Sequence, residues 1–252
     1  MTELIVPLRT RDGVVPPVAQ VRGTLLASSL RVVRERGRLD DYLARLPADY
    51  HQPLLHAVPG VWLPVATAMA HYRAVDALGF SVADQTEIGR DIAARTQGSL
   101  LGTILRLATN VGVTPWAAIG SFQRLWDRLM QGGSAAVYKI GPKEARIEGH
   151  GVPMAEIAYF RNGWRGMIGA SAEMFAKKAY AQELPAFENR TTVAYRLEHR
   201  TCWRTEDFKG FRVSLGATTT DTHVSEEEQR RETKESRRKP TGANMIGALA
   251  WA

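Results

Sequence analysis

Histidine is the residue type in this chain that is best suited to metal binding and proton transfer. The sequence contains six of them, namely His51, His56, His71, His150, His199 and His223. None stands in an HExxH motif or beside a CxxC pair, and the lone Cys202 cannot build a zinc ribbon. We therefore expect no metal site, and we expect these histidines to lie at the surface or at helix caps.

The glycines and hydroxyl residues give no catalytic signature either. The sequence has no GxxxxGK[ST] loop for phosphates and no GxSxG nucleophile elbow. Gly163, Gly166 and Gly169 are spaced by three, which places them on one stripe of a predicted helix. That spacing favours close packing against a sheet over contact with a phosphate. No acid, base or nucleophile can be nominated, so enzyme activity is the least favoured function.

Large aromatic residues on predicted helix faces are the remaining candidates for a site. They are Trp62, Tyr72, Trp116, Phe122, Trp126, Tyr159 and Trp164. Such residues fill cores, and they also line cavities for apolar ligands. The core reading is favoured for any single one of them. As pocket candidates we select Trp62, Tyr72, Trp126 and Trp164.

The elements that must position these residues follow from periodicity. Helical spacing begins at Val21 and recurs in residues 40–46, 64–78, 81–98 and 101–112. Thr114-Pro115 is a strong helix start, and the helix that follows it ends at Gly132-Gly133. After Gly132-Gly133 the pattern changes to a β-hairpin over 136–149, a helix over 155–181 and a strand over 191–200. We predict an α+β fold in which a helical N-terminal half packs on a small antiparallel sheet in the C-terminal half. No strand is expected before residue 130.

Domain organisation follows from the same reading. Residues 1–20 read as an N-terminal arm or edge segment, residues 21–215 as a single α+β ligand-binding-like domain, and residues 216–252 as a charged tail with an apolar C-terminus. In that apolar end, Ile246, Leu249 and Trp251 are candidates for binding a partner, although docking back onto the domain is favoured.

Composition limits the function classes. The chain has 252 residues, of which 44% are hydrophobic and 23% charged, so it can bury a full core. It has no apolar run of the ~18 residues needed to span a membrane, and its N-terminus does not resemble a signal peptide. A single cysteine suits a reducing cytoplasm.

The formal net charge of +7 leaves nucleic-acid binding open. The basic residues concentrate modestly in Arg31–Arg38 and in Arg190–Arg212, without forming one basic block. Ordinary solvated surface is the favoured interpretation of both segments.

Several segments taken together carry a family resemblance. They are VRGTLLASSLRVVRERG, VWLPVATAMAHYRAV, TPWAAIGSFQRLW and WRGMIGASAEMFAKKAY followed by TTVAYRLEHR. By these segments the chain resembles an uncharacterised paralogous family found in myxobacteria. That family is similar in layout to a superfamily of haem-based nitric-oxide-binding domains, 4-vinyl-reductase-type ligand-binding domains and transport-particle subunits. The resemblance covers roughly residues 21–200.

The resemblance implies ligand binding, and it allows a comparison with the haem-binding members. Those members hold the propionates with a Tyr-x-Ser-x-Arg motif and ligate iron with a histidine. The nearest string here, Tyr195 to His199, lacks the serine and the arginine, and no histidine lies between Gln131 and His150. We therefore expect no cofactor, with haem disfavoured.

The sequence favours a non-enzymatic cytoplasmic sensor or adaptor that binds a small apolar or amphipathic ligand between the helical half and the sheet. The first alternative is a protein–protein assembly subunit, a dimerising platform that uses the C-terminal tail. The second alternative is a nucleic-acid-binding module. A homo-oligomer or a protein partner is expected in the first two cases.

Overall fold

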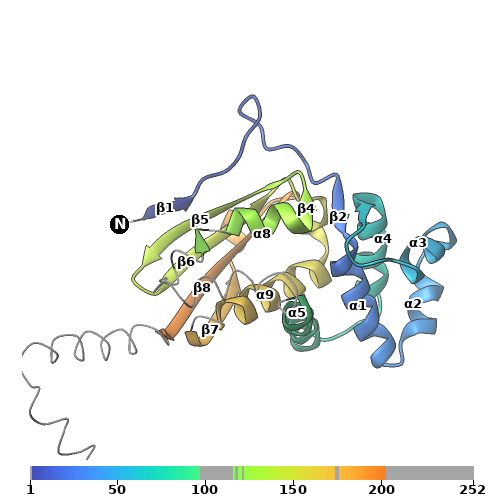
Figure 1. The fold of residues 1–252 in the computed structure, drawn as a ribbon. Helices are drawn as coiled ribbons and strands as arrows, with labels where there is room; N and C mark the ends of the chain where they lie inside the picture. The colour runs from blue at the N-terminus through green and yellow to red at the C-terminus, as the bar shows by residue number, and fades with distance from the viewer. Residues whose placement is uncertain (1, 97–115, 117–118, 121, 174–175, 203–252) are drawn as a thin grey trace, which may run out of the picture. The chain divides into compact units, whose positions relative to one another are not determined.

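The computed structural model describes residues 2–96, 116, 119–120, 122–173 and 176–202 (Figure 1). The chain divides into two compact units, residues 1–205 and 206–252, and the description below concerns the first. No helix in the described ranges is long and apolar enough to cross a membrane.

The described strands form a five-stranded antiparallel sheet in the order β1-β5-β6-β8-β7. The strands are β1 (Glu3–Val6), β5 (Ser134–Gly141), β6 (Glu144–His150), β7 (Ala176–Glu183) and β8 (Thr192–Cys202). Val137, Ile147 and Tyr195 are register partners on one face. All three are buried, which gives the sheet one apolar face for helices to cover.

Two helices cover that apolar face. They are α8 (Phe122–Leu129) and α9 (Ala158–Ala172). The Tyr195 hydroxyl donates a 3.0 Å hydrogen bond to the carbonyl of Arg161 on α9. The Gln123 side-chain carbonyl of α8 accepts the backbone N–H of Ala135 on β5.

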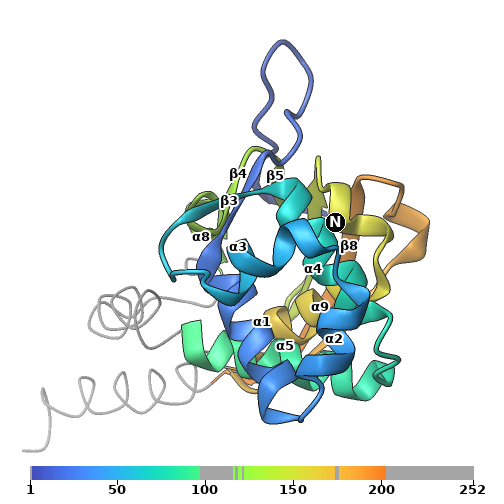
Figure 2. The same ribbon diagram turned by 90° about the vertical axis from the view of Figure 1, so that its right-hand side faces the viewer.

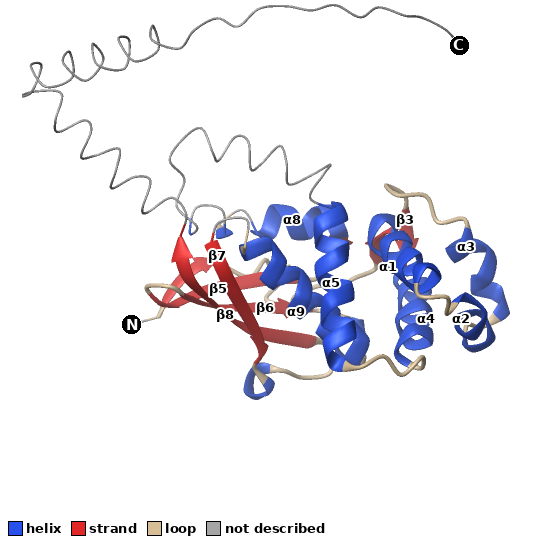
Figure 3. Ribbon diagram, turned by 90° about the horizontal axis from the view of Figure 1, so that it is seen from below, coloured by secondary structure: helices blue, strands red, loops and turns tan. Residues whose placement is uncertain are grey.

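The remaining helices form a layer beyond α9, which Figures 2 and 3 show from two directions. They are α1 (Gly23–Glu35), α2 (Leu39–Arg45), α3 (His51–Leu55), α4 (Val65–Asp76) and α5 (Val82–Thr96). A small sheet in the order β3-β2-β4 joins this layer to the end of α8. Its strands are β2 (Gln20–Arg22), β3 (Trp62–Pro64) and β4 (Met130–Gln131).

Helices α5 and α9 approach each other closely because glycines meet at their crossing. A Cβ on Gly89 would lie 2.0 Å from the Gly163 carbonyl oxygen, and a Cβ on Gly166 would lie 2.0 Å from the Thr86 carbonyl oxygen. Real side chains do not tolerate such distances, so only glycine permits this backbone contact. The glycine stripe therefore has a packing role as expected, but at Gly166 it packs against a helix rather than a sheet.

The predicted α+β class is confirmed, with helices over 23–35, 65–76 and 82–96 and a hairpin over 134–150. Two expectations are wrong. Strands β1, β2 and β3 precede residue 130, because β1 pairs with β5, and the residues just before α1 form β2, which pairs with β3 and β4. The predicted helix over 155–181 ends at Ala172, and residues 176–183 form β7 instead, since pairing with β8 overrides the helix propensity of alanine and lysine.

Candidate functional site

Aromatic rings from three helices meet at the junction of the helical layer and the sheet. The Trp126 ring of α8 lies 5.7 Å from the Trp164 ring of α9, measured between centroids. Phe160 lies 5.8 Å from Trp164 and 5.3 Å from Tyr72 of α4. These tilted and edge-on contacts fall in the range that aromatic pairs prefer. We call these four residues the aromatic cluster.

A small cavity lies beside the aromatic cluster, with a volume of about 20 Å³. Side chains from four helices border it, including Leu25, Tyr72, Ile92, Tyr159, Trp164 and Met167. A volume of about 10–15 Å³ on this measure admits one water molecule. Its lining is largely apolar, with two tyrosines at its edge. In this conformation it has room for an occupant of about the size of one water molecule.

The structure brings together three of the four pocket candidates predicted from the sequence. Tyr72 and Trp164 border the cavity, and Trp126 packs on Trp164. Trp62 lies elsewhere, on β3, where its ring stacks 4.0 Å from the Arg22 guanidinium. The partner-binding candidates Ile246, Leu249 and Trp251 lie outside the described residues.

Trp126 is fixed against the sheet by glycines. Its Nε1 donates a 3.0 Å hydrogen bond to the Gly132 carbonyl. A Cβ on Gly149 of β6 would lie only 3.0 Å from the Trp126 ring. The absence of a side chain at residue 149 therefore makes room for the indole between α8 and β6. The position of Trp126 in the aromatic cluster thus depends on a glycine at residue 149.

A buried chain of hydrogen bonds runs beside the cavity. His71 Nδ1 lies 2.8 Å from the Tyr42 hydroxyl, and His71 Nε2 lies 2.9 Å from the Ser29 hydroxyl. The Ser29 oxygen lies 2.6 Å from the Tyr159 hydroxyl. We call these four residues the His71 network. It joins α1, α2, α4 and α9, and Tyr159 connects it to the cavity wall.

Burial controls the protonation of this network. It lowers the pKa of His71 to about 3, so the imidazole is neutral. Burial likewise raises the pKa of Tyr159 to about 12, and it raises the pKa of Tyr42 above its ordinary value. At neutral pH the network is therefore an uncharged set of donors and acceptors. Sequence reasoning expected a surface or capping histidine at residue 71; only its position on the buried face of α4 could have indicated otherwise.

The contacts of Ser29 and His71 resemble those of a nucleophile and its base, with Tyr42 as the orienting group. Both residues are fully buried, at 0% exposure. The cavity beside Tyr159 holds about one water, so within the described residues an acyl substrate has no route to Ser29. The arrangement supports positioning of four helices rather than catalysis.

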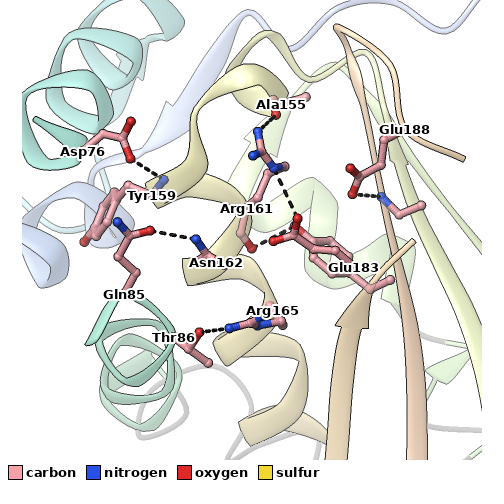
Figure 4. A network of polar contacts seen from close by, with 12 residues as sticks. Asp76, Gln85, Thr86, Ala155, Tyr159, Arg161, Asn162, Arg165, Glu183 and Glu188 are labelled. Atoms are coloured by element: carbon pink, nitrogen blue, oxygen red, sulfur yellow. Dashed lines mark hydrogen bonds and ion pairs between the residues drawn. The ribbon is translucent and has the colours of Figure 1, made fainter. Parts of the chain in front are cut away.

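Polar contacts on both sides of α9 make it the central element of the site (Figure 4). Toward the helical layer, Asp76 accepts the backbone N–H of Tyr159 at 2.8 Å, and the Asn162 amide donates to Gln85 at 2.8 Å. Toward the sheet, Arg161 donates to the Ala155 carbonyl and forms an ion pair with Glu183 of β7. A displacement of α9 would therefore change polar contacts with both the helical layer and the sheet.

The other described histidines differ in their partners. His51 contacts the Leu46 carbonyl, His56 the Gln52 carbonyl, and His150 the buried Glu148 carboxylate. His199 is 7% exposed, and neither of its ring nitrogens has a hydrogen-bond partner among the residues that the structure describes. Within the described part of the chain, no three His, Cys, Asp or Glu residues are grouped so as to hold a metal ion.

No protein-family model matches the chain, and no curated protein matches it. The resemblance to the myxobacterial family therefore stays a prediction. Solved structures do match. The Fe(II) unliganded H-NOX protein from K. algicida is 11% identical, with a TM-score of 0.51 over 72% of this chain and 98% of that chain. The I5F mutant of T. Tengcongensis H-NOX is also 11% identical, with a TM-score of 0.50 over 72% of this chain and 99% of that chain.

These neighbours contradict the expectation that the protein has no cofactor and that haem is disfavoured. The K. algicida neighbour is an Fe(II) protein, and another match at TM-score 0.50 concerns haem distortion in the H-NOX family. The comparison therefore points to haem as a candidate cofactor. The absence of one binding motif does not exclude haem, because other residues can bind its propionates and its iron.

The described residues do not accommodate a haem in this conformation. Pockets for cofactors and other small molecules occupy about 300–1,000 Å³. The cavity beside Tyr159 has a volume of only about 20 Å³. Both ring nitrogens of His71 already have partners. Residues 97–115 adjoin this region in sequence and lie outside the described ranges. At the level of fold, 72% of this chain shares the α+β architecture of the H-NOX domains that it matches.

Proposed function

We propose that this protein is a cytoplasmic, non-enzymatic sensor domain that binds a small apolar or amphipathic ligand at the cavity beside Tyr159. The observation that carries the proposal is the cavity itself, which lies where α1, α4 and α5 meet α9. Aromatic walls with a few polar groups are typical of small-ligand sites. The fold shared with H-NOX domains supports the same class, and the single cysteine supports the compartment.

The size of the cavity sets the ligand class. A cavity of about 20 Å³ must enlarge to take a benzene- or indole-sized occupant, and the flexible thioether of Met167 is the part of the wall that moves most readily. Tyr72 and Tyr159 border the cavity together with aliphatic and aromatic side chains, so a small, largely apolar molecule fits it best.

Binding there would be transmitted because the cavity borders four helices at once. An occupant that pushes Tyr159 also changes the hydrogen bonds to Ser29 and, through Ser29, to His71. The response would then reach α2 through Tyr42. A sensor needs such a coupled element, with two arrangements that a ligand can bias.

A thermal-shift titration of the full chain with indole, benzene and haemin tests this function. We expect indole or benzene to raise the melting temperature in proportion to concentration. Gly163 also lines the cavity, and a Cβ there meets nothing within 4 Å, so Gly163→Leu should abolish the shift by filling the cavity. Gly169→Ala on the same helix, whose nearest atom is a terminal Arg90 nitrogen at 3.7 Å, is the matched control.

Each outcome has a defined meaning. A shift that Gly163→Leu removes and Gly169→Ala retains supports the site. Haemin uptake with a Soret band that Gly163→Leu also removes would make haem the ligand of the same site. If no probe shifts the melting temperature, or if Gly163→Leu binds as well as the parent chain, the proposal is overturned.

The two alternative functions have unequal support. For nucleic-acid binding, the arginines of the first basic segment are engaged within the molecule: Arg36 pairs with Asp84 at 2.8 Å and Arg38 with Asp41 at 2.7 Å. An assembly role gains support from a separate surface, described next. The part of that role assigned to Ile246, Leu249 and Trp251 stays a prediction.

A further inference from the structure

The five-stranded sheet has a second face, opposite α8 and α9, which we call the outer face. Side chains alternate along each strand, so the register identifies its members. One row across the sheet consists of Tyr138, Arg146, Arg196 and Gln182, each the register partner of the next. The adjacent row on the same face consists of Glu144, Glu198 and Tyr180. The outer face thus carries a positive row beside a negative row.

Like charges that stand directly opposite each other on neighbouring strands are destabilising. Arg146 faces Arg196, and Glu144 faces Glu198, so the same unfavourable pairing occurs twice. Diagonal contacts offset part of it, since Arg196 Nη2 lies 2.9 Å from Glu144 Oε2. The outer face still presents a row of positive charge next to a row of negative charge. A surface that carries the two rows in the opposite order would complement it.

The two arginines differ in how firmly they are held. Arg146 lies between the rings of Tyr138 and Phe187, at 4.2 and 4.3 Å, and its Nε is 2.7 Å from the buried Glu148 carboxylate. The side chain of Arg196 is 42% exposed. Arg146 therefore belongs to the structure of the sheet, while Arg196 is accessible to a partner.

Exposed apolar groups accompany these charges. Leu4, Tyr180 and Phe187 are 53%, 39% and 45% exposed. A groove of about 180 Å³ runs between Tyr180, Gln182, Arg196 and Glu198. Aromatic and arginine side chains around a groove have the composition of interface centres.

We propose that the outer face pairs with the outer face of a second copy of this chain. A two-fold axis that runs across the strands between the two rows places the positive row of one copy over the negative row of the other. Arg196 then faces Glu198 of the partner subunit, and the contact is made twice, as two-fold symmetry requires. Charge complementarity is what selects a second copy as the occupant.

The extent of the sheet sets the strength of the contact. β8 is eleven residues long, whereas the other strands of this sheet have four to eight residues. The outer-facing residues Ala136, Glu148 and Ala194 are buried within the molecule, so the accessible part of the face gives a contact below the ~800 Å² per partner of a standard interface. Because the rows are charged and partly solvated, we expect a reversible dimer that higher salt weakens.

Sedimentation velocity of the full chain over a hundredfold range of concentration tests the proposal. We expect a monomer–dimer equilibrium. Arg196→Glu and Glu198→Arg should each weaken self-association at least tenfold, because each opposes like charges across the axis. An equimolar mixture of the two variants should restore the dimer, since every contact across the axis is then attractive. Arg190→Glu, at a side chain that is 93% exposed, is the control for charge reversal elsewhere.

Additional variants keep the test decisive. Tyr180→Ala changes no charge and should also weaken the dimer. A chain that ends at residue 242 should dimerise as the parent does. The proposal is overturned if the parent chain is monomeric throughout, if the mixture does not restore association, or if truncation at residue 242 removes the dimer while Arg196→Glu leaves it intact. Circular-dichroism melts establish that each variant is folded.

Discussion

His71 Nδ1 and the Tyr42 hydroxyl lie 2.8 Å apart, and both side chains are completely buried. This contact joins α4 to α2, while the other ring nitrogen of His71 reaches α1 through Ser29. A neutral imidazole accepts a hydrogen bond at one nitrogen and donates one at the other, so a hydroxyl on each side satisfies it without a counter-charge. The helical layer is therefore built around an imidazole that must remain uncharged.

The first prediction concerns acid stability. The pKa of His71 is about 3 in the folded protein against 6.5 as the ordinary value. The unfolded chain therefore binds an extra proton between these values, and stability is full above pH 6.5 and declines as the pH falls toward 3. We expect a loss of about 3 kcal/mol from this residue at pH 4.

Urea unfolding between pH 4 and 7.5 measures this loss. In His71→Asn the decline should be smaller, although the variant is less stable at neutral pH. His56→Gln, at a histidine with only a local backbone contact, should keep the slope of the parent chain. An unchanged slope in His71→Asn would show that other groups cause the acid sensitivity.

The second prediction concerns the coupling of Ser29 and Tyr159. Ser29→Ala leaves both the His71 Nε2 and the Tyr159 hydroxyl without their partner, which costs about 1–3 kcal/mol. Tyr159→Phe removes one of the same contacts, so the double variant should lose less than the sum of the two single losses. A double-mutant cycle by chemical denaturation measures the difference. Strict additivity would mean that the two hydroxyls do not interact in solution.

The third prediction compares two glycines on α9. In Gly166→Ala the new methyl group would meet the Thr86 carbonyl at 2.0 Å, so α5 and α9 must separate and we expect a loss of about 3 kcal/mol or more. In Gly163→Ala the methyl group meets nothing within 4 Å, and the better helix propensity of alanine should add about 0.5–1 kcal/mol. Equal effects of the two substitutions on the free energy of unfolding would contradict the close crossing of these helices.

The fourth prediction separates the two tryptophans. Trp164→Ala removes a ring that is 7% exposed and should cost about 3–5 kcal/mol. Part of that loss should be recovered by saturating indole, which can occupy the space left. Trp62→Ala removes a half-buried ring and its cation–π contact, itself worth about 0.5–1 kcal/mol, and indole should not compensate that loss. Chemical denaturation at constant temperature, with and without indole, distinguishes these outcomes.

Sequence reasoning identified most of the helices because their apolar positions recur at helical spacing and their ends carry clear signals. Thus Pro64 precedes α4, and Gly79 adopts a positive φ of 70° soon after it. It could not identify β1 or β2, since strands of three or four residues are defined by partners more than a hundred positions away. Local patterns carry no information about such partners.

The site was predictable only in part, for a related reason. Aromatic type and helical face selected Tyr72, Trp126 and Trp164 as pocket residues; the three lie in one aromatic cluster, and their role in binding a ligand stays a prediction. The same criterion selected Trp62, although a ring on a short edge strand stacks on Arg22 at the surface. Ser29 and His71 were missed because their connection depends on the relative placement of α1 and α4. The expectation against haem rested on a missing propionate motif and a missing axial histidine, and the haem-binding structural neighbours contradict it.

The pairing of β1 with β5 affects the order in which the protein can assemble. The backbone N–H of Arg9 bonds to the Ser134 hydroxyl, and the Pro16 carbonyl accepts the N–H of Gly133. Residues 3–16 therefore become ordered only after segments more than a hundred positions later in the chain have been made. Contacts of such long sequence separation slow folding. Nascent chains arrested before residue 134 should therefore leave their N-terminal arm open to proteases, and a bulky N-terminal fusion would interfere with the last step of sheet closure.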